Sequence, residues 1–269
     1  MSPWPNEAWG SRTFLMGILN ITPDSFSDGG EFSSVQKGVQ HALDMVAAGA
    51  DFIDVGAEST RPGAVEVPAE EEWLRLEPVL SALRDSVDVP ISVDTYKAEV
   101  AEKALSAGAA IANDIGGLQM DERMAEVIAS AGAGAVVMHN SRNQDVTGDI
   151  ISSICVFFEE SLRRADRAGI SRDRIVLDPG IGFGKSVEEN LTILRSIDRL
   201  RSFGYPLLLG ASRKSVIGMT LDLPVDQRLE GTLATTVAGI AGGVDVVRVH
   251  DVEANLRASR MSDAIFRNE

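Results

Sequence analysis

Eight short apolar runs recur along this chain of 269 residues, and their spacing limits what the chain can fold into. Runs of this length that are rich in Val, Ile and Leu are typical of buried parallel strands. The runs occupy residues 14–20, 52–57, 90–94, 110–115, 135–139, 175–180, 206–212 and 244–250. Segments with helical spacing separate them, as at 68–84, where one face carries Trp73, Leu76, Val79, Leu80 and Leu83. This alternation predicts a parallel sheet with right-handed helical crossovers.

Eight strand and helix units favour closure of that sheet into a barrel. The predicted fold class is therefore α/β, a (β/α)₈ TIM barrel, with an open doubly wound sheet as the alternative. We expect one domain, in which residues 14–269 form the barrel and residues 1–13 form an N-terminal segment that covers its floor. Ala-Gly pairs at 48–49, 107–108, 131–132, 168–169 and 241–242 precede predicted strands, and we interpret them as helix ends on a left-handed residue.

The charge balance limits the class of partner. Lys and Arg number 25 against 40 Asp and Glu, and a net charge of -15 repels polyanions, which argues against a nucleic-acid surface. Cys155 is the one cysteine, so no intrachain disulfide can form, and this fits a reducing compartment. The first residues lack a basic and apolar leader, and no apolar run reaches the ~20 residues of a membrane helix. We expect a cytoplasmic protein that binds no membrane.

Polar side chains stand at the carboxyl end of every predicted strand. In a barrel these ends face the catalytic mouth. The alternative is that such residues cap the following helices or satisfy buried backbone groups. Carboxylates and amides that converge can bind the donor edge of a heterocycle, whereas clustered cations suit phosphate oxygens. The residues are Asn20, Asp54, Glu58, Asp94, Asn113, Asp114, His139, Asp178, Ser212, Arg213, Lys214, Arg248, His250 and Asp251. The pattern indicates a small anionic substrate.

Three segments between the runs have unusual composition. Residues 22–30 form a long polar segment with Phe26, which we interpret as a lid over the mouth and not as a simple turn. Residues 58–63 combine a hydroxyl, a guanidinium and a turn, suited to a carboxylate or phosphate. Residues 178–185 hold three glycines that permit close backbone approach, but their spacing fits neither a Walker A loop nor a dinucleotide fingerprint.

Seven segments carry a resemblance to a known family. They read MGILNITPDSFSDGG, GAESTRPGA, ISVDT, NDIGG, DPGIGFGK, GASRKS and RVHDV, within residues 14–252. In this order they are similar to the dihydropteroate synthases. The resemblance implies a transferase of folate synthesis that condenses 6-hydroxymethyl-7,8-dihydropterin diphosphate with 4-aminobenzoate, giving 7,8-dihydropteroate and pyrophosphate. It also implies a Mg²⁺ ion, a homodimer, and inhibition by sulfonamides, which mimic aminobenzoate.

The resemblance also implies roles for individual residues. The pterin would be held by Asp94, Asn113, Asp178 and Lys214, with Met138 against its ring. Asn20 would bind the Mg²⁺-diphosphate with Thr60, Arg248 and His250, and the aminobenzoate would contact Arg61, Phe183 and Ser212, with Pro62 and Lys214 nearby. Catalysis would rest on Asp94, Asp28, Lys214 and Arg248, in which Arg248 stabilises the departing diphosphate and the two carboxylates stabilise a cationic pterin methylene.

Two departures and two alternatives accompany this interpretation. Ala57 stands where the family usually has Gly, and residues 138–142 read MHNSR in place of the frequent MHMxG, which affects the contacts of that loop. One alternative is a methyltetrahydrofolate methyltransferase that passes its methyl group to a corrinoid; such enzymes share the pterin site but do not need Arg61, Ser212 and Lys214. The other is a non-catalytic pterin-binding paralogue.

Overall fold

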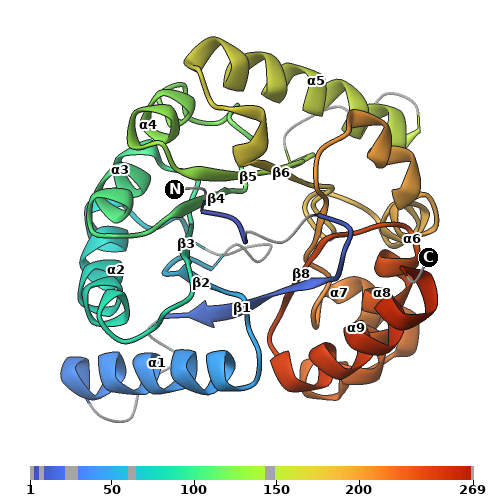
Figure 1. The fold of residues 1–269 in the computed structure, drawn as a ribbon, viewed down its shortest axis with the longest axis horizontal. Helices are drawn as coiled ribbons and strands as arrows, with labels where there is room; N and C mark the ends of the chain where they lie inside the picture. The colour runs from blue at the N-terminus through green and yellow to red at the C-terminus, as the bar shows by residue number, and fades with distance from the viewer. Residues whose placement is uncertain (1–2, 6–8, 22–29, 60–64, 143–148, 268–269) are drawn as a thin grey trace.

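The computed structural model describes residues 3–5, 9–21, 30–59, 65–142 and 149–267, with backbone only for 30–34. Within these residues eight parallel strands form one sheet in the order β6-β5-β4-β3-β2-β1-β8-β7. The Leu177 N–H donates to Pro206 O across 2.9 Å, and Leu177 bridges Leu207, so β6 and β7 close the sheet. Figure 1 shows the helices arranged around this sheet. The predicted TIM barrel is confirmed.

The strands are β1 (Phe14–Asn20), β2 (Phe52–Gly56), β3 (Ile91–Asp94), β4 (Ile111–Asp114), β5 (Gly134–Met138), β6 (Ile175–Asp178), β7 (Leu208–Leu209) and β8 (Val246–Val249). The α-helices are α1 (Gly30–Ala47), α2 (Ala69–Arg84), α3 (Ala98–Ser106), α4 (Met124–Ala131), α5 (Ile150–Ala168), α6 (Val187–Arg195), α7 (Ser215–Leu221), α8 (Leu229–Ala241) and α9 (Val252–Phe266). Short 3₁₀ helices cover Arg172–Arg174 (η2), Ile197–Phe203 (η3) and Val225–Gln227 (η4).

The seventh strand is shorter than its apolar run. We expected residues 206–212, but only Leu208–Leu209 are strand. The chain turns directly afterwards, because the Lys214 N–H donates to Ala211 O and Arg213 adopts a left-handed φ of 56°. This turn brings the polar residues 212–214 to the barrel mouth, next to the end of β8.

The interior of the barrel is filled by aliphatic and aromatic side chains from the first halves of the strands. The cluster contains Trp4, Phe14, Met16, Phe52, Ile111, Val136, Val176, Leu208 and Val246. Trp4 meets Phe52 and Trp9 meets Phe14 edge to face, with ring centroids 5.6 and 5.3 Å apart. Both phenylalanines begin their strands, so these tryptophans pack at the end of the barrel opposite the mouth.

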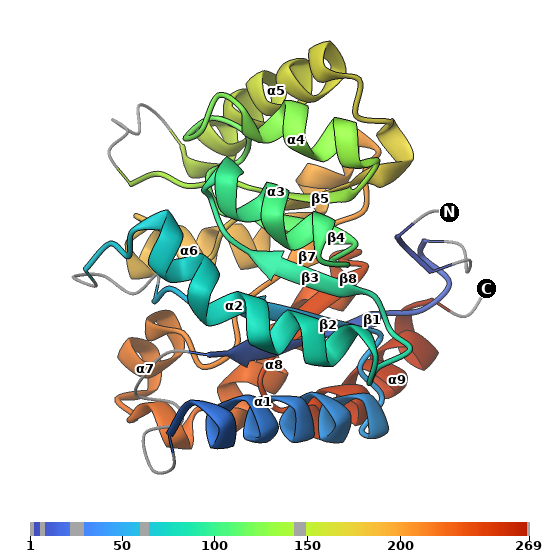
Figure 2. The same cartoon turned by 90° about the vertical axis from the view of Figure 1, so that its left-hand side faces the viewer.

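The last helix is tied to the same end. Asp263 on α9 accepts hydrogen bonds from the backbone N–H and the hydroxyl of Thr13, at 2.8 and 2.7 Å. Figure 2 shows the first described residues and the end of α9 on the same side of the molecule, away from α7. Among the described helices, none is long and apolar enough to cross a membrane.

Candidate active site

An ion triad lies inside the mouth of the barrel. Arg248 on β8 donates from Nε to Asp54 Oδ2 on β2 and from Nη2 to Asp94 Oδ2 on β3, each at 2.6 Å. Asp54 also accepts from the Asn113 amide of β4 at 3.0 Å. Asp54 is fully buried, and only 13% and 15% of the Asp94 and Arg248 side chains are exposed. Four strands therefore contribute to one buried polar cluster.

The charges of this triad do not balance. The pKa of Asp94 is raised to about 7, mainly by burial; Arg248 opposes the rise, and the neighbouring Asp54 carboxylate contributes to it. The two carboxylates raise the pKa of Arg248 against the effect of its burial, so the guanidinium stays charged. Asp54 Oδ1 and Asp94 Oδ1 are buried without a hydrogen-bond partner in the described part of the chain. Such oxygens are suited to N–H donors of a bound ligand.

A second group of charges lies around Gly210, next to Arg248. A Cβ on Gly210 would lie 3.7 Å from Asp178 Oδ2, 3.8 Å from Lys214 Nζ and 3.9 Å from Arg248 Cβ. Burial lowers the pKa of Lys214 to about 8, and Asp178 counteracts this shift. Burial raises the pKa of Asp178. The predicted pterin residues Asp94, Asn113, Asp178 and Lys214 thus come from the last residues of β3, β4 and β6 and from the turn after β7.

Phe183 forms an apolar wall beside these charges. It packs with Ile115 and Met138, and Tyr96 lies against the same cluster. Lys214 Nζ lies 4.6 Å from the centroid of the Phe183 ring, and the Arg142 guanidinium lies 4.9 Å from it. The structure therefore brings three of the predicted residues together, Met138, Phe183 and Lys214. A flat ring bound here would meet an aromatic face and a cation.

Some of the remaining predicted residues are described by the structure, and the others lie outside the described residues. Ser212 Oγ lies 2.9 Å from His250 Nδ1 and accepts from the His250 backbone N–H at 3.2 Å, so the ends of β7 and β8 hold these side chains together. Asn20 ends β1 and is exposed. Asp28, Thr60, Arg61 and Pro62, with the expected lid and Phe26, lie outside the described residues.

Some of the other polar strand ends serve structure, as the capping alternative expected. Asp114 accepts from the N–H groups of Gly116 and Leu118, at 2.7 and 2.6 Å, and holds the turn after β4. Arg213 pairs with Asp251 at 2.5 Å. Burial lowers the pKa of His139 to about 3, so this imidazole is neutral, and it packs edge-on against Phe157.

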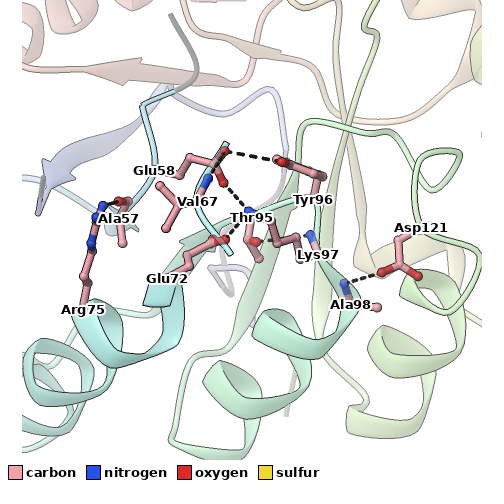
Figure 3. A network of polar contacts seen from close by, with 10 residues as sticks. All are labelled: Ala57, Glu58, Val67, Glu72, Arg75, Thr95, Tyr96, Lys97, Ala98 and Asp121. Carbon is pink, nitrogen blue, oxygen red and sulfur yellow. Dashed lines mark hydrogen bonds and ion pairs between the residues drawn. The ribbon is translucent and has the colours of Figure 1, made fainter. Parts of the chain in front are cut away.

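A buried network joins the ends of β2 and β3 to α2 (Figure 3). Lys97 Nζ contacts Glu58 Oε2 and lies 2.7 Å from Glu72 Oε2. Glu58 Oε1 accepts from the Tyr96 hydroxyl at 3.4 Å and from the Val67 N–H at 3.3 Å. Glu58 therefore joins the two sides of the segment that follows β2.

Asp54 is the main residue that motif reasoning missed. The sequence predicts it only as a polar strand end, whereas the structure places it in contact with Arg248 and Asn113. Position 54 lies in the middle of β2 among apolar residues, in the order Phe-Ile-Asp-Val-Gly. A carboxylate inside a buried strand needs a partner, and that need was the signal available in the sequence.

The mouth offers few protein ligands for a metal ion. No group of three or more His, Cys, Asp or Glu side chains is arranged to hold one in the ranges that the structure describes. Mg²⁺, however, is often held by one or two protein oxygens together with substrate phosphates and water. The exposed Asn20 at the end of β1 offers one amide oxygen of this kind.

Comparison with known proteins matches this site to a family. Residues 16–250 match the family described as pterin binding enzyme. A dihydropteroate synthase of Clostridium beijerinckii is 49% identical over 259 residues, which cover 96% of each chain. The Bacillus subtilis dihydropteroate synthase is 48% identical over 258 residues, covering 95% of this chain and 89% of the relative.

This chain belongs to the dihydropteroate synthase family. Its barrel superposes on a Clostridium difficile dihydropteroate synthase crystallised in the presence of pteroic acid, with a TM-score of 0.95, 53% identity, and coverage of 97% of this chain and 100% of the other. A Xanthomonas albilineans dihydropteroate synthase with 4-aminobenzoic acid gives a TM-score of 0.91 at 39% identity, covering 97% and 95%. The family predicted from the motifs is confirmed.

The structure also accounts for the departure from the frequent family pattern after β5. The Asn140 amide donates to Ile115 O at 3.1 Å and its oxygen accepts from the Arg142 N–H at 3.0 Å. The Ser141 hydroxyl donates to Phe183 O at 3.2 Å. In this dihydropteroate synthase relative, residues 140–142 thus connect the ends of β4, β5 and β6.

Proposed function

We infer that this chain is a dihydropteroate synthase, a transferase that joins 6-hydroxymethyl-7,8-dihydropterin diphosphate to 4-aminobenzoate with release of pyrophosphate. The observation that carries this inference is the buried cluster of Asp54, Asp94 and Arg248 beside Asp178 and Lys214, in a chain 49% identical to a dihydropteroate synthase along nearly its whole length. A pterin edge rich in N–H groups and a diphosphate match such a mixture of carboxylates and cations.

The pterin site follows from the polar atoms left for a ligand. We assign the N–H groups of the pterin to Asp94 and Asp178, and its acceptors to the amide of Asn113 and the ammonium of Lys214. Asp94 and Asp178 end their strands, Asn113 is the next-to-last residue of β4, and Lys214 follows the turn after β7. Met138, which is 2% exposed and packs with Phe183, would lie against the pterin ring. These are roles for groups that the barrel already holds in place.

We assign the diphosphate to Arg248 and His250, with Asn20 and Thr60 beside it. A Mg²⁺ ion bound with the diphosphate would neutralise charge on the leaving pyrophosphate. Arg248 supplies a second positive charge, and its position between two carboxylates keeps it oriented. As the methylene C–O bond breaks, pyrophosphate leaves, and the aminobenzoate nitrogen bonds to the cationic methylene and loses a proton. Asp94 and Asp28 would stabilise that cation.

The aminobenzoate would lie between Phe183, Ser212 and Lys214, with Arg61 and Pro62 supplied by the segment after β2. Phe183 and Lys214 already face one another, at 4.6 Å. A Yersinia pestis dihydropteroate synthase has been solved with a sulfonamide drug. We propose that sulfonamides inhibit this chain by competing at the same position. The homodimer and the cytoplasmic location also stay predictions, the former testable by light scattering.

The function is tested by measuring pyrophosphate release from the pterin diphosphate, with and without 4-aminobenzoate, in Mg²⁺ and again in EDTA. We expect release that requires both the aminobenzoate and the metal ion. Tight binding of the pterin diphosphate without either product would leave the pterin site in place but reduce the protein to the non-catalytic alternative. Methyl transfer from methyltetrahydrofolate to a corrinoid, with no pyrophosphate release, would favour the other alternative.

A further inference from the structure

Lys185 lies behind the active site, in the segment between β6 and α6. Its ammonium lies within hydrogen-bond distance of three backbone carbonyl oxygens, those of Gly180 at 2.8 Å, Phe183 at 3.1 Å and His139 at 3.3 Å. Gly180 and Phe183 belong to the segment after β6, whereas His139 directly follows β5. An ammonium has three N–H donors, so these three acceptors can use all of them.

The two segments that Lys185 joins are in close backbone contact. A Cβ on Gly180, whose φ is +68°, would lie 1.9 Å from His139 O, and a Cβ on Gly184 would lie 2.5 Å from the Arg142 nitrogen. The Ser141 hydroxyl donates to Phe183 O at 3.2 Å. The Lys185 ammonium lies in this seam between the segments after β5 and β6. It therefore contributes to the position of the backbone that carries Phe183.

The surroundings of Lys185 oppose its charge, except for two carboxylates. The pKa of Lys185 is lowered to about 7, mainly by burial, and the cations Lys214 and Arg142 contribute to the decrease. Asp178 at the end of β6 and Glu189 on α6 act in the opposite direction. The three carbonyl oxygens replace the water that the ammonium has lost. Burial of this ammonium costs free energy, and its hydrogen bonds go to the segments after β5 and β6.

We propose that Lys185 is a positioning residue for the second substrate, because its ammonium fixes the Phe183 backbone against the segment that follows β5. This inference rests on the proposed function, which assigns Phe183 to the aminobenzoate. Asp178 needs less support from Lys185, since it ends β6 and its carboxylate accepts from the Gly180 N–H at 2.7 Å. Loss of Lys185 should therefore affect aminobenzoate more than pterin.

The positioning claim can be tested without any assay of activity. Lys185→Met keeps the length of the side chain and removes its donors. Three amides in the segment are hydrogen-bonded: Gly180 to Asp178, Gly182 to Asn190 at 2.7 Å, and Phe183 to Gly180 O at 3.2 Å. We expect their hydrogen exchange to be about tenfold faster in the variant, while amides of β1 stay unchanged. Unchanged exchange in residues 180–183 would overturn the inference.

Kinetics test the consequence for the substrates. In Lys185→Met we expect the KM for aminobenzoate to rise about tenfold, with kcat and the Kd for pterin diphosphate within about threefold of the wild type. Lys103→Met is the matched control, because Lys103 is surface-exposed and pairs with Glu99 on α3. If the wild type turns over and Lys185→Met behaves like Lys103→Met, the inference fails while the proposed function stands. If the wild type does not turn over, the proposed function fails and the exchange experiment still decides the positioning claim.

A milder variant covers the case in which Lys185→Met does not fold. Ser141→Ala removes one hydroxyl from the same seam and leaves Lys185 in place. It should raise the KM for aminobenzoate about threefold and speed exchange at Phe183. Equal losses for both substrates, in step with a lower Tm, would show that the seam supports only the general stability of the barrel.

Discussion

Arg248 is a single guanidinium that faces two buried carboxylates, and this ratio determines what a ligand must supply. Asp54 and Asp94 each bind it through one oxygen, at 2.6 Å, and their other oxygens lack partners among the described residues. Buried acceptors without donors cost free energy in the empty protein. A ligand with several N–H donors removes that cost when it binds, which favours a pterin edge over a purely anionic ligand.

Removing Arg248 should have two separable effects. In Arg248→Ala, Asp54 and Asp94 lose their counter-charge, and breaking a buried pair in this way costs about 3–5 kcal/mol of stability. We also expect the Kd for pterin diphosphate to rise roughly 100-fold through loss of a charged contact. Urea unfolding and calorimetry measure the two. Arg213→Ala is the control, because the side chains of the Arg213–Asp251 pair are 36% and 24% exposed and the pair should contribute about 1 kcal/mol or less. Near-normal binding in Arg248→Ala would contradict the diphosphate assignment.

The raised pKa of Asp94 predicts how stability depends on pH. The folded protein keeps this proton up to about pH 7, whereas the unfolded chain releases it near the ordinary value of 3.8. The folded state thus binds more protons between these values, so this group makes the protein less stable as pH rises from about 4 to 7, by up to about 1.4 kcal/mol per unit. Asp94→Asn should reduce that decline, measured by urea unfolding at pH 5 and 7. The exposed Glu126→Gln should leave the decline as in the wild type; an equal decline in Asp94→Asn would disprove the shift.

At the scale of elements, β2, β3 and α2 are joined by a buried network with one cation. Lys97, which directly precedes α3, pairs with both Glu58 and Glu72, whose side chains are 10% and 1% exposed (Figure 3). Burial raises the pKa of Glu72, and Lys97 opposes this rise. Without the lysine, both carboxylates would remain buried and unpaired.

Lys97→Met should therefore destabilise the barrel by about 3–5 kcal/mol. Lys103→Met is the control, six residues further along the chain. It breaks the exposed Lys103–Glu99 pair, which should cost about 0.5 kcal/mol or less. Equilibrium unfolding in urea compares the two directly. Because Glu58 also accepts from the Val67 N–H, we expect the extra loss to be accompanied by faster exchange of that amide. Equal stability of the two variants would show that the network of Lys97, Glu58 and Glu72 does not stabilise the barrel.

The sequence predicted elements better than their ends. Apolar runs placed all eight strands, because burial on both faces leaves a pattern that local reading can detect. The sequence did not predict the turn that shortens β7, because this turn depends on the left-handed backbone conformation of Arg213. The prediction that Ala-Gly pairs end helices on a left-handed residue is confirmed at four glycines, which have positive φ: Gly49, Gly108, Gly132 and Gly169. It was wrong at Gly242, where φ is -83° and the following Gly243 is left-handed at +89°.

The site shows the same division. Motifs predicted Asp94, Asp178 and Lys214 as site residues, and the structure places all three at the mouth of the barrel. The pairing of Arg248 with Asp54 joins residues 194 positions apart, and the contacts of Lys185 depend on two loops that meet. Such partners are set by closure of the barrel, so no local pattern reveals them.

Across the whole molecule, the two ends of the barrel have different tasks. The polar clusters occupy the mouth, while Trp4, Trp9 and Asp263 secure the opposite end, where both chain ends lie (Figure 2). Layers of Phe, Ile, Val, Leu and Met side chains separate them. Substitutions at the end opposite the mouth should therefore affect the mouth only by changing the stability of the fold.

Trp4→Ala tests this separation. Trp4 is 4% exposed and fills the end of the barrel against Phe52, so its removal leaves a cavity that should cost about 3–5 kcal/mol. Trp73→Ala on α2 removes the same side chain from a partly exposed position and should cost less. Well below the Tm, both variants should keep the wild-type kcat and both KM values, because Trp4 packs with Phe52 at the end opposite the mouth and Trp73 lies on α2, outside the barrel interior. A changed KM in Trp4→Ala, with Trp73→Ala unaffected, would show that the packing of the end opposite the mouth alters the position of the strand ends that bind substrate.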